Sequence, residues 1–181
     1  MHIILRPYQN KDAEAFAAAV NASLDTLLPW LLWAHAGFTP AEARQWFSIT
    51  HLLRNKGEAN ELGLFAPDGR LLGGAGLRYS REQRDHCSIG YWVRSSEQRQ
   101  GIASYAVRHL VELAWQSPER KVVEILAVEE NVASRGVAVR CGAEFKGIKY
   151  GLIVLDSGPV NTAIYHFHRQ AQSHTRSNSF A

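Results

Sequence analysis

The chain has 181 residues, of which 46% are hydrophobic and 20% are charged. This length suits one domain, and the composition is that of an ordinary globular protein, so intrinsic disorder is excluded for most of the chain. The formal net charge of +3 permits an anionic ligand. It is too small to predict direct binding to nucleic acid.

The two cysteines, Cys87 and Cys141, lie far apart and in no C-x-x-C spacing, which argues against a disulfide framework and a cysteine zinc cluster. The N-terminal residues lack the apolar core of a signal peptide. The most apolar stretch, 27–34, is too short to span a membrane. We therefore expect a soluble, cytoplasmic protein with no membrane partner. Residues 1–169 form the expected domain, and residues 170–181, rich in polar side chains, a flexible tail.

Two helices are expected after a short strand at residues 3–6. The first helix runs from an N-cap at Asn10 to about Leu28, because apolar residues recur there at helical spacing. The segment Thr39-Pro40-Ala41-Glu42 combines an N-cap, a proline at the first helical position and a capping box. It predicts a second helix that ends near Arg54.

The rest of the chain alternates strands with two further helices. A helical period begins at Gly101 and ends near Ser117, and a shorter helix opens at Asn131 and ends with Gly142 at its C′ position. Six runs are expected as strands: 62–66, 71–79, 87–93, 122–128, 145–155 and 161–169. The order β-α-α-β-β-β-α-β-α-β-β predicts a mixed α/β sheet with helices on both faces.

The loop between the strand at 87–93 and the helix at Gly101 is suited to anion binding. Small residues at Gly101 and Ala103 let the backbone approach a ligand closely, and the start of a helix offers free N–H groups. Arg94 and Arg99 lie beside these groups in the sequence. An ordinary strand-to-helix connection, in which Gly101 only relieves crowding, explains the same residues.

The segment Gln98-Arg99-Gln100-Gly101-Ile102-Ala103 matches the pattern Q/R-x-x-G-x-G/A. It resembles the pyrophosphate loop of the GNAT superfamily of acetyl-CoA-dependent N-acetyltransferases. Ile89-Gly90-Tyr91-Trp92-Val93, Asn131-Val132-Ala133-Ser134-Arg135 and Arg140-Cys141-Gly142-Ala143 are similar to segments of the RimJ/RimL type of GNAT protein. The similarity covers residues 3–169 and implies the GNAT fold.

The resemblance implies that acetyl-CoA is the acetyl donor and lies where the strand at 87–93 separates from the strand at 122–128. The loop would hold the pyrophosphate, and the end of the strand at 87–93 would pair with the pantetheine arm. The residues expected to bind the donor are Trp92, Val93, Arg94, Arg99, Gln100, Gly101, Ile102, Ala103, Ser104, Asn131 and Ser134. The histidines show no metal-binding spacing, and no metal is expected.

Ser134 and Ser88 are the expected catalytic residues. Ser134 matches a residue that faces the thioester sulfur in relatives, where its hydroxyl could hydrogen-bond the departing thiolate. A helix cap, with Asn131 as N-cap and Ser134 in the first turn, explains both residues without catalysis. No acidic base is assigned, because Ser88 stands where many relatives have a glutamate and Ile153 where some have another acid. The candidate substitutes are Asp85, His86 and Glu129.

A site without a carboxylate base favours an α-amine as acceptor. An α-amine, with a pKa of about 8, is neutral in roughly a tenth of molecules at pH 7, whereas a lysine amine, at about 10.4, is almost entirely protonated. With Ser88 or Tyr150 and water assisting, the expected acceptor is a protein N-terminus, ribosomal or other, or an amino acid. Trp30 and Trp33 could form an aromatic acceptor wall, although packing under a loop explains them as well.

Two other functions remain open from the sequence. One is acetylation of a small amine such as an amino acid, a polyamine or an antibiotic. The other is a catalytically weak acyl-CoA-binding module, which the residues Ser88 and Ile153 suggest. The resemblance to the RimJ/RimL type also implies a homodimer, with the outer face of the terminal hairpin as its interface.

Overall fold

The computed structural model describes residues 1–170. The strands are β1 (Ile4–Arg6), β2 (Ala59–Phe65), β3 (Leu71–Tyr79), β4 (His86–Val93), β5 (Val122–Val128), β6 (Glu144–Leu155) and β7 (Gly158–His168). The helices are α1 (Ala13–Asn21), α2 (Leu24–Leu27), α3 (Pro40–Asn55), α4 (Ile102–Trp115) and α5 (Val132–Arg140), with single 3₁₀ turns η1 (Asn10–Asp12) and η2 (Ser95–Glu97). The expected tail lies outside the described residues, apart from residue 170.

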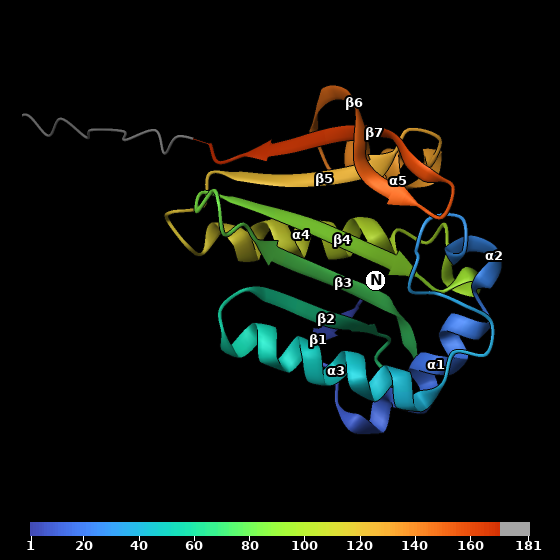
Figure 1. The fold of residues 1–181 in the computed structure, drawn as a ribbon. Helices are drawn as coiled ribbons and strands as arrows, with labels where there is room; N and C mark the ends of the chain where they lie inside the picture. The colour runs from blue at the N-terminus through green and yellow to red at the C-terminus, as the bar shows by residue number, and fades with distance from the viewer. Residues whose placement is uncertain (171–181) are drawn as a thin grey trace, which may run out of the picture.

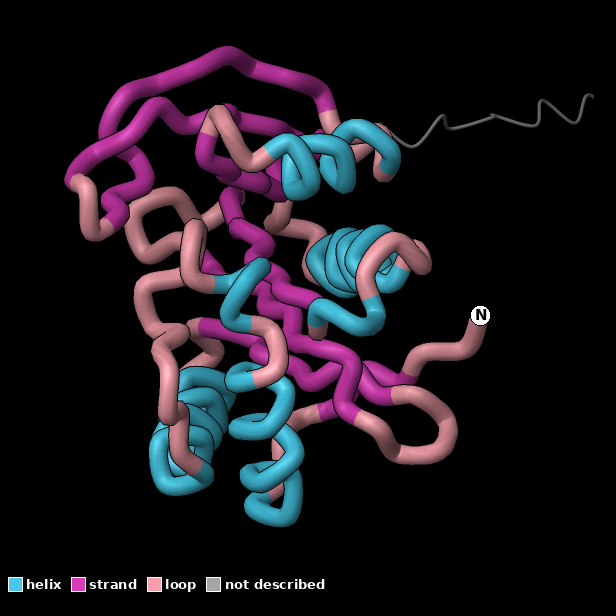
Figure 2. Tube along the Cα trace, turned by 90° about the vertical axis from the view of Figure 1, so that its right-hand side faces the viewer, coloured by secondary structure: helices cyan, strands magenta, loops and turns pink. Residues whose placement is uncertain are grey.

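Within residues 1–170 the strands form one seven-stranded sheet in the order β1-β2-β3-β4-β5-β7-β6, with helices on both faces (Figures 1 and 2). This arrangement confirms the mixed α/β sheet predicted from the element order. The pair β4–β5 is parallel and is joined only over His86–Ser88 and Val122–Glu124. Beyond Ser88 the two strands move apart (Figure 1). The sheet therefore has an opening at its centre.

A separate apolar core lies on each face of the sheet. On one face, α4 and α5 pack against the central strands, and Leu110, Val107 and Ile125 are fully buried there. On the other face, α1 and α3 cover β2 and β3, and the rings of Tyr8 and Phe47 stack with centroids 4.6 Å apart. The second core is rich in aromatic rings. It does not cover all of β3 and β4 on its side of the sheet.

The N-terminal helix is split, so the single helix expected from Asn10 to Leu28 is wrong. Asn10 is not an N-cap but the first residue of η1. The backbone N–H of Gln9 donates to Oδ2 of Asp12 at 2.8 Å, and Arg6 donates to both oxygens of Asp12 at 2.8 and 2.9 Å. These bonds fasten η1 to β1 before α1 begins.

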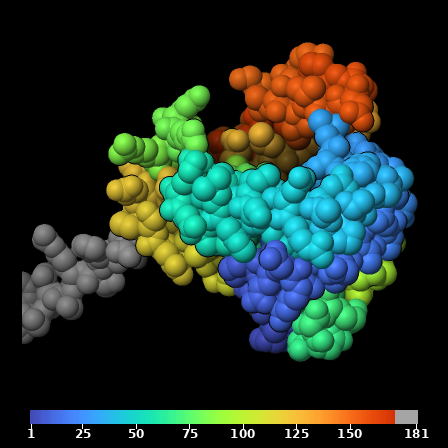
Figure 3. Space-filling model, turned by 60° about the horizontal axis from the view of Figure 1, so that its bottom comes forward, coloured from blue at the N-terminus to red at the C-terminus, as the bar shows by residue number. Residues whose placement is uncertain are grey.

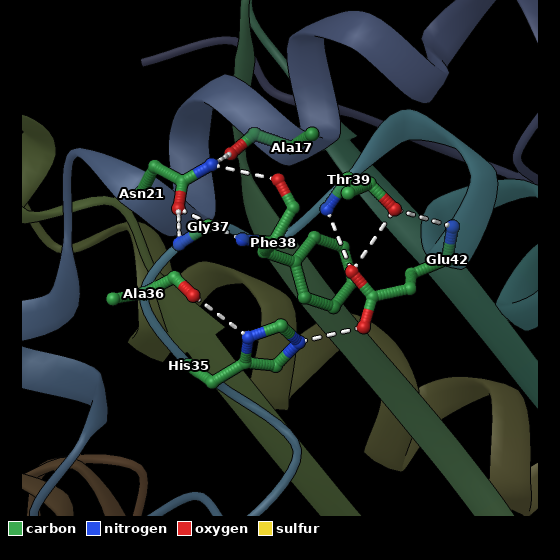
Figure 4. A network of polar contacts seen from close by, with 8 residues as sticks. All are labelled: Ala17, Asn21, His35, Ala36, Gly37, Phe38, Thr39 and Glu42. Carbon is green, nitrogen blue, oxygen red and sulfur yellow. Dashed lines mark hydrogen bonds and ion pairs between the residues drawn. The ribbon is translucent and has the colours of Figure 1, made fainter.

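The side-chain amide of Asn21 accounts for the end of α1 (Figure 4). Its Nδ2 donates to the carbonyl oxygens of Ala17 and Phe38 at 3.0 and 2.8 Å. Its Oδ1 accepts from the backbone N–H groups of Gly37 and Phe38, both at 3.1 Å. One side chain thus joins the last turn of α1 to a loop seventeen residues later. Helical periodicity cannot reveal this contact, because it depends on tertiary structure.

The predicted start of α3 is confirmed (Figure 4). Oγ1 of Thr39 accepts from the N–H of Glu42 at 3.2 Å, and Oε2 of Glu42 accepts from the N–H of Thr39 at 2.7 Å. The other oxygen of Glu42 contacts Nε2 of His35 at 2.6 Å. The bond from Thr39, followed by the contact with His35, holds the pKa of Glu42 below its ordinary value. This network fastens the 28–39 loop to α3.

Two strands begin three residues earlier than predicted. β2 begins at Ala59, three residues before its expected start, because polar Asn60 and Glu61 interrupt the apolar run although they pair with β3. β7 begins at Gly158, so Pro159 belongs to the strand and not to the connection. Pro159 pairs with Val154 of β6 and not with β5. Because no second strand lies beside it, the N–H that proline lacks is not needed for a bond there. Over residues 1–170, no helix has the length and apolar character needed to cross a bilayer.

Candidate active site

A cleft of about 940 Å³ opens where β4 and β5 separate. It is bordered by α2, the second half of β4, the start of α4, the end of β5 and the first turns of α5. Its lining includes these residues expected to bind the donor: Trp92, Val93, Arg99, Gly101, Ile102, Ala103, Ser104, Asn131 and Ser134. The other two, Arg94 and Gln100, do not line it. The amide of Gln100 lies 3.4 Å from Oε2 of Glu97 instead.

The loop before α4 has the backbone geometry of an anion cradle. Arg99 and Gly101 both have left-handed backbone conformations, with φ of 61° and 78°. Within residues 1–170, no acceptor is found for the backbone N–H groups from Arg99 to Ser104. A Cβ at Gly101 would meet only the end of the Met1 side chain, at 3.6 Å. The loop therefore fits the pyrophosphate of a nucleotide cofactor, which needs N–H donors at a helix start.

The first turn of α5 carries Ser134 at the side of the cleft. Oδ1 of Asn131 accepts from the N–H of Ser134 at 3.2 Å, which confirms the predicted N-cap. The hydroxyl of Tyr91 donates to the carbonyl oxygen of Ser134 at 2.9 Å and lies 3.0 Å from its Oγ. The position of the Ser134 hydroxyl is therefore set from two elements, α5 and β4.

Tyr91 is a site residue that the sequence interpretation did not identify. Burial raises the pKa of its hydroxyl to about 12, although the hydrogen bond to Ser134 opposes this shift. The phenol is therefore neutral at physiological pH and serves as a hydrogen-bonding partner. The only sequence signal was its place in the strand before the loop, where an aromatic residue is common for packing alone.

A second cavity of about 480 Å³ lies between α3 and the faces of β3 and β4. Figure 3 shows the surface hollowed between α3, in cyan, and the β6–β7 hairpin, in orange. Aromatic side chains dominate the cavity wall: Tyr8, Phe16, Trp33, Phe38, Trp46, Tyr91 and Trp92. Leu31 and the three residues Gly90, Tyr91 and Trp92 line both the cavity and the cleft. The two spaces therefore meet at the second half of β4.

The polar side chains of this cavity come from β2, β3 and α3. Glu61 is buried, with 5% of its surface exposed, and its Oε1 accepts from Nε of Arg78 at 2.6 Å. Burial, and then the nearby charge of Glu61, raise the pKa of the Tyr8 hydroxyl. Neither Glu61 nor Arg78 was selected from the sequence. Glu61 precedes the predicted strand 62–66, and Arg78 is the one charged residue of the run 71–79. For both, a solvent-facing position is the ordinary explanation.

The residues predicted to bind or activate the acceptor are only partly brought together. Trp33 lines the aromatic cavity, and Trp30 lines the cleft. Ser88 and Tyr150 line neither space. Ser88 pairs with Arg78 of β3 and Glu124 of β5, and Tyr150 is 68% exposed on β6.

The three substitute bases also lie apart from both spaces. Asp85 and His86 contact each other, with 2.8 Å between Oδ1 and Nδ1. Glu129 accepts from the amide of Asn161 at 3.0 Å. Ile153, which stands where some relatives have an acid, does line the cleft.

Comparisons with known proteins agree with this geometry. The family model described as "Acetyltransferase (GNAT) domain" matches residues 2–144. A protein of Bacillus subtilis (strain 168), named "Putative ribosomal N-acetyltransferase YdaF", is 31% identical over 143 residues, which cover 78% of this chain and 77% of that protein.

Solved structures show the same fold. The structure titled "a putative ribosomal-protein-serine acetyltransferase from Vibrio cholerae" has a TM-score of 0.81 and 26% identity, and the match covers 93% of this chain and 95% of that one. The microcin C7 self immunity acetyltransferase MccE, solved with acetyl-CoA and AMP, has a TM-score of 0.85 over 92% of each chain. Its identity of 19% supports the fold alone. These matches confirm the resemblance to RimJ/RimL-type proteins, and the chain belongs to the GNAT family of acetyltransferases.

Proposed function

We propose that this acetyltransferase moves the acetyl group of acetyl-CoA to the α-amine of a protein N-terminus in the cytoplasm. The observation that carries the proposal is the meeting of two separate spaces at Gly90, Tyr91 and Trp92 of β4. One space has an anion-binding loop, and the other has an aromatic wall. Two different substrates could therefore approach each other from opposite sides of one strand.

The donor fits the cleft. Acetyl-CoA, when bound, supplies an activated acetyl group as a thioester. The free N–H groups from Arg99 to Ser104 would hold its pyrophosphate at the positive end of α4. The β5-facing edge of β4 has no strand partner beyond Ser88, so its backbone is available to an extended ligand arm. Such positioning lowers the entropy cost of bringing amine and thioester together.

Ser134 would act on the departing sulfur. Its hydroxyl would donate a hydrogen bond to the thiolate that leaves as the new amide bond forms. A bond to a charged group of this kind contributes about 1.5–3 kcal/mol. Tyr91 would hold the hydroxyl in place by sharing its proton between the carbonyl oxygen and Oγ of Ser134, at 2.9 and 3.0 Å, so that the Ser134 proton stays available for the thiolate. An acceptor that is already partly neutral near pH 7 can attack without a carboxylate base. The proton that its nitrogen loses as the amide forms would pass to water.

The names of the relatives support a protein acceptor. The Bacillus subtilis protein is named as a ribosomal N-acetyltransferase, and the Vibrio cholerae structure as a ribosomal-protein-serine acetyltransferase. A ribosomal protein N-terminus is therefore the first acceptor to test. Small amines such as polyamines remain the competing class.

The test is to incubate the protein with acetyl-CoA and peptides that carry both a free N-terminus and an internal lysine. Fragmentation mass spectrometry then locates the acetyl group. We expect it on the α-amine, and we expect no transfer to the same peptide with a formylated N-terminus. Acetylation of lysine alone, or of spermidine much faster than of any peptide, would refute the proposed acceptor. Intact acetyl-CoA binding without any turnover would indicate a binding module.

A further inference from the structure

The aromatic cavity contains one charged pair, Glu61 and Arg78. The side chain of Glu61 is more than nine-tenths buried, and its Oε1 is held by Nε of Arg78 at 2.6 Å. Its second oxygen, Oε2, has no hydrogen-bond partner among residues 1–170. Both residues line the cavity. A buried carboxylate is costly unless it is paired, so the position of Arg78 is strongly tied to that of Glu61.

Glycines make room for this pair on the sheet. A Cβ at Gly76 would lie 2.0 Å from Oε2 of Glu61 and 2.4 Å from its Cδ. The carboxylate therefore rests directly on the backbone of Gly76. In the sheet, Gly76 pairs with Glu61 on one side and with Gly90 on the other. The carboxylate thus lies one strand away from Gly90, or about 5 Å by ordinary strand spacing.

The guanidinium of Arg78 covers Gly90 itself. A Cβ at Gly90 would lie 3.2 Å from Nη1 and 3.4 Å from Nη2 of Arg78. Neither of these nitrogens has an acceptor in the described part of the chain, residues 1–170, and the side chain is 54% exposed. Because Gly90 lines both spaces, Arg78 presents two free N–H-bearing nitrogens at the place where donor and acceptor would meet.

We propose that Arg78, positioned by Glu61, binds the carbonyl oxygen next to the amine of the acceptor. This inference rests on the proposed function. An amine that reacts beside Gly90 brings its neighbouring atoms under the guanidinium. In an N-terminal residue or a free amino acid, the amine and the carbonyl group are bonded to the same carbon atom. The amine of a lysine side chain or a polyamine has no carbonyl oxygen at this distance. Arginine's planar fork suits a carbonyl or carboxylate oxygen.

The pair would therefore select the substrate class. Glu61 neutralises the charge of Arg78 and fixes Nε, leaving Nη1 and Nη2 for the acceptor. Arg78 is an acceptor-binding residue, and Glu61 is a positioning residue that acts through it. The shared chemistry is a 2-amino carbonyl group, which a peptide presents as an amide and a free amino acid as a carboxylate.

The experiment compares phenylalaninamide, phenylalanine and phenethylamine as acceptors at saturating acetyl-CoA. These compounds share the amine and the ring and differ in the carbonyl group. We expect Arg78→Ala to raise KM for the first two roughly 10- to 100-fold, as for loss of a charge-assisted hydrogen bond. KM for phenethylamine should change less than about twofold, since it has no carbonyl to lose. Glu61→Gln should give the same pattern with smaller shifts.

Arg81→Ala is the matched control. Arg81 lies near the end of the same strand, pairs with Glu58 at 2.5 Å and lines neither space. It should leave all three KM values unchanged. An equal effect of Arg78→Ala on the three acceptors, or no effect on any, would overturn the inference.

Binding gives the same comparison without turnover. The three compounds are titrated calorimetrically into wild-type and Arg78→Ala protein saturated with CoA. Absence of acetyl transfer in the kinetic experiment would refute the proposed function. Absence of a preference for the carbonyl compounds in the binding experiment would overturn this inference. Tighter binding of the amide than of the carboxylate would identify the peptide as the source of the carbonyl, and the reverse order a free amino acid.

Discussion

The hydroxyl of Tyr91 lies 3.0 Å from Oγ of Ser134 and donates to the carbonyl oxygen of the same residue at 2.9 Å. The contact joins β4 to the first turn of α5 across the opening between β4 and β5. Because burial keeps the Tyr91 phenol neutral, with a pKa raised to about 12, the hydroxyl is a stable partner for Ser134 over the physiological pH range.

Replacing these two hydroxyls tests whether they act as one unit. Ser134→Ala should lower kcat roughly 10- to 100-fold, since the bond to the departing sulfur is lost. Tyr91→Phe keeps the ring and should lower kcat less, by about tenfold or below, because it only frees the Ser134 hydroxyl. In Tyr91→Phe/Ser134→Ala, kcat should fall no further than in Ser134→Ala. Steady-state kinetics with a saturating acceptor measure all three values.

Two controls accompany these variants. The dissociation constant of acetyl-CoA should stay within about threefold of wild type, because neither hydroxyl is placed at the pyrophosphate loop. Fully additive losses of kcat in the double variant would show that Tyr91 does not work through Ser134.

The loop before α4 was predictable because its residues are contiguous in the sequence. A strand, a loop with Gly101 and a helix start follow one another from Ile89 to Ser104, and local backbone conformation decides their geometry. The Asn131 cap was predictable for the same reason: its bond to Ser134 spans three residues. Chain-order patterns capture such local relations.

The contacts between side chains of distant segments could not be predicted. Glu61 and Arg78 are seventeen residues apart, and Tyr91 and Ser134 are 43 apart. Each of these side chains has an ordinary explanation when considered alone. The break after α1 has the same origin, since Asn21 bonds to a carbonyl seventeen residues away. Tertiary contacts of this kind override local periodicity.

The stability of the N-terminal segment should depend on pH through Asp12. Burial raises the pKa of Asp12, but the hydrogen bonds from Arg6 and Gln9 outweigh it and lower the pKa below its ordinary value. The ionised carboxylate therefore stabilises the folded protein above about pH 4, and this contribution is lost as the pH falls through the folded-state pKa. At pH 7, Asp12→Asn should lower the free energy of unfolding by about 1–3 kcal/mol.

Urea denaturation at pH 7 and pH 3 measures the Asp12 effect. The difference between wild type and Asp12→Asn should shrink at the lower pH. Asp68→Asn serves as control, because Asp68 pairs with Arg70 on the exposed surface and its loss should cost nothing measurable. A destabilisation by Asp12→Asn that is equal at both pH values would contradict the assignment.

Adding one methyl group at Gly76 should disturb the acceptor side and spare the donor side. Its Cβ would lie 2.0 Å from Oε2 of Glu61, so the carboxylate that now holds Arg78 must shift. Gly76→Ala should raise KM for the acceptor, leave the affinity for acetyl-CoA unchanged and cost about 1–3 kcal/mol of stability through overpacking. Kinetics and thermal denaturation measure these effects.

Gly57→Ala is the comparison for Gly76→Ala. A Cβ at Gly57 would meet no atom within 4 Å, and its φ of 68° makes the substitution strained. It should lower stability and leave KM unchanged. If Gly76→Ala behaved in the same way, the position of the Glu61 carboxylate would not matter for the acceptor.

The central claim is that the loop before α4 holds the pyrophosphate of acetyl-CoA, and calorimetric titration of acetyl-CoA tests it most directly. Gly101→Glu places bulk and a negative charge in the cradle, while Gly57→Glu places the same residue at a left-handed glycine outside the cleft. We predict binding by the wild type and by Gly57→Glu, and loss of binding by Gly101→Glu, with all three proteins folded by circular dichroism. Absence of binding by the folded wild type, or unchanged affinity in Gly101→Glu, would contradict the account.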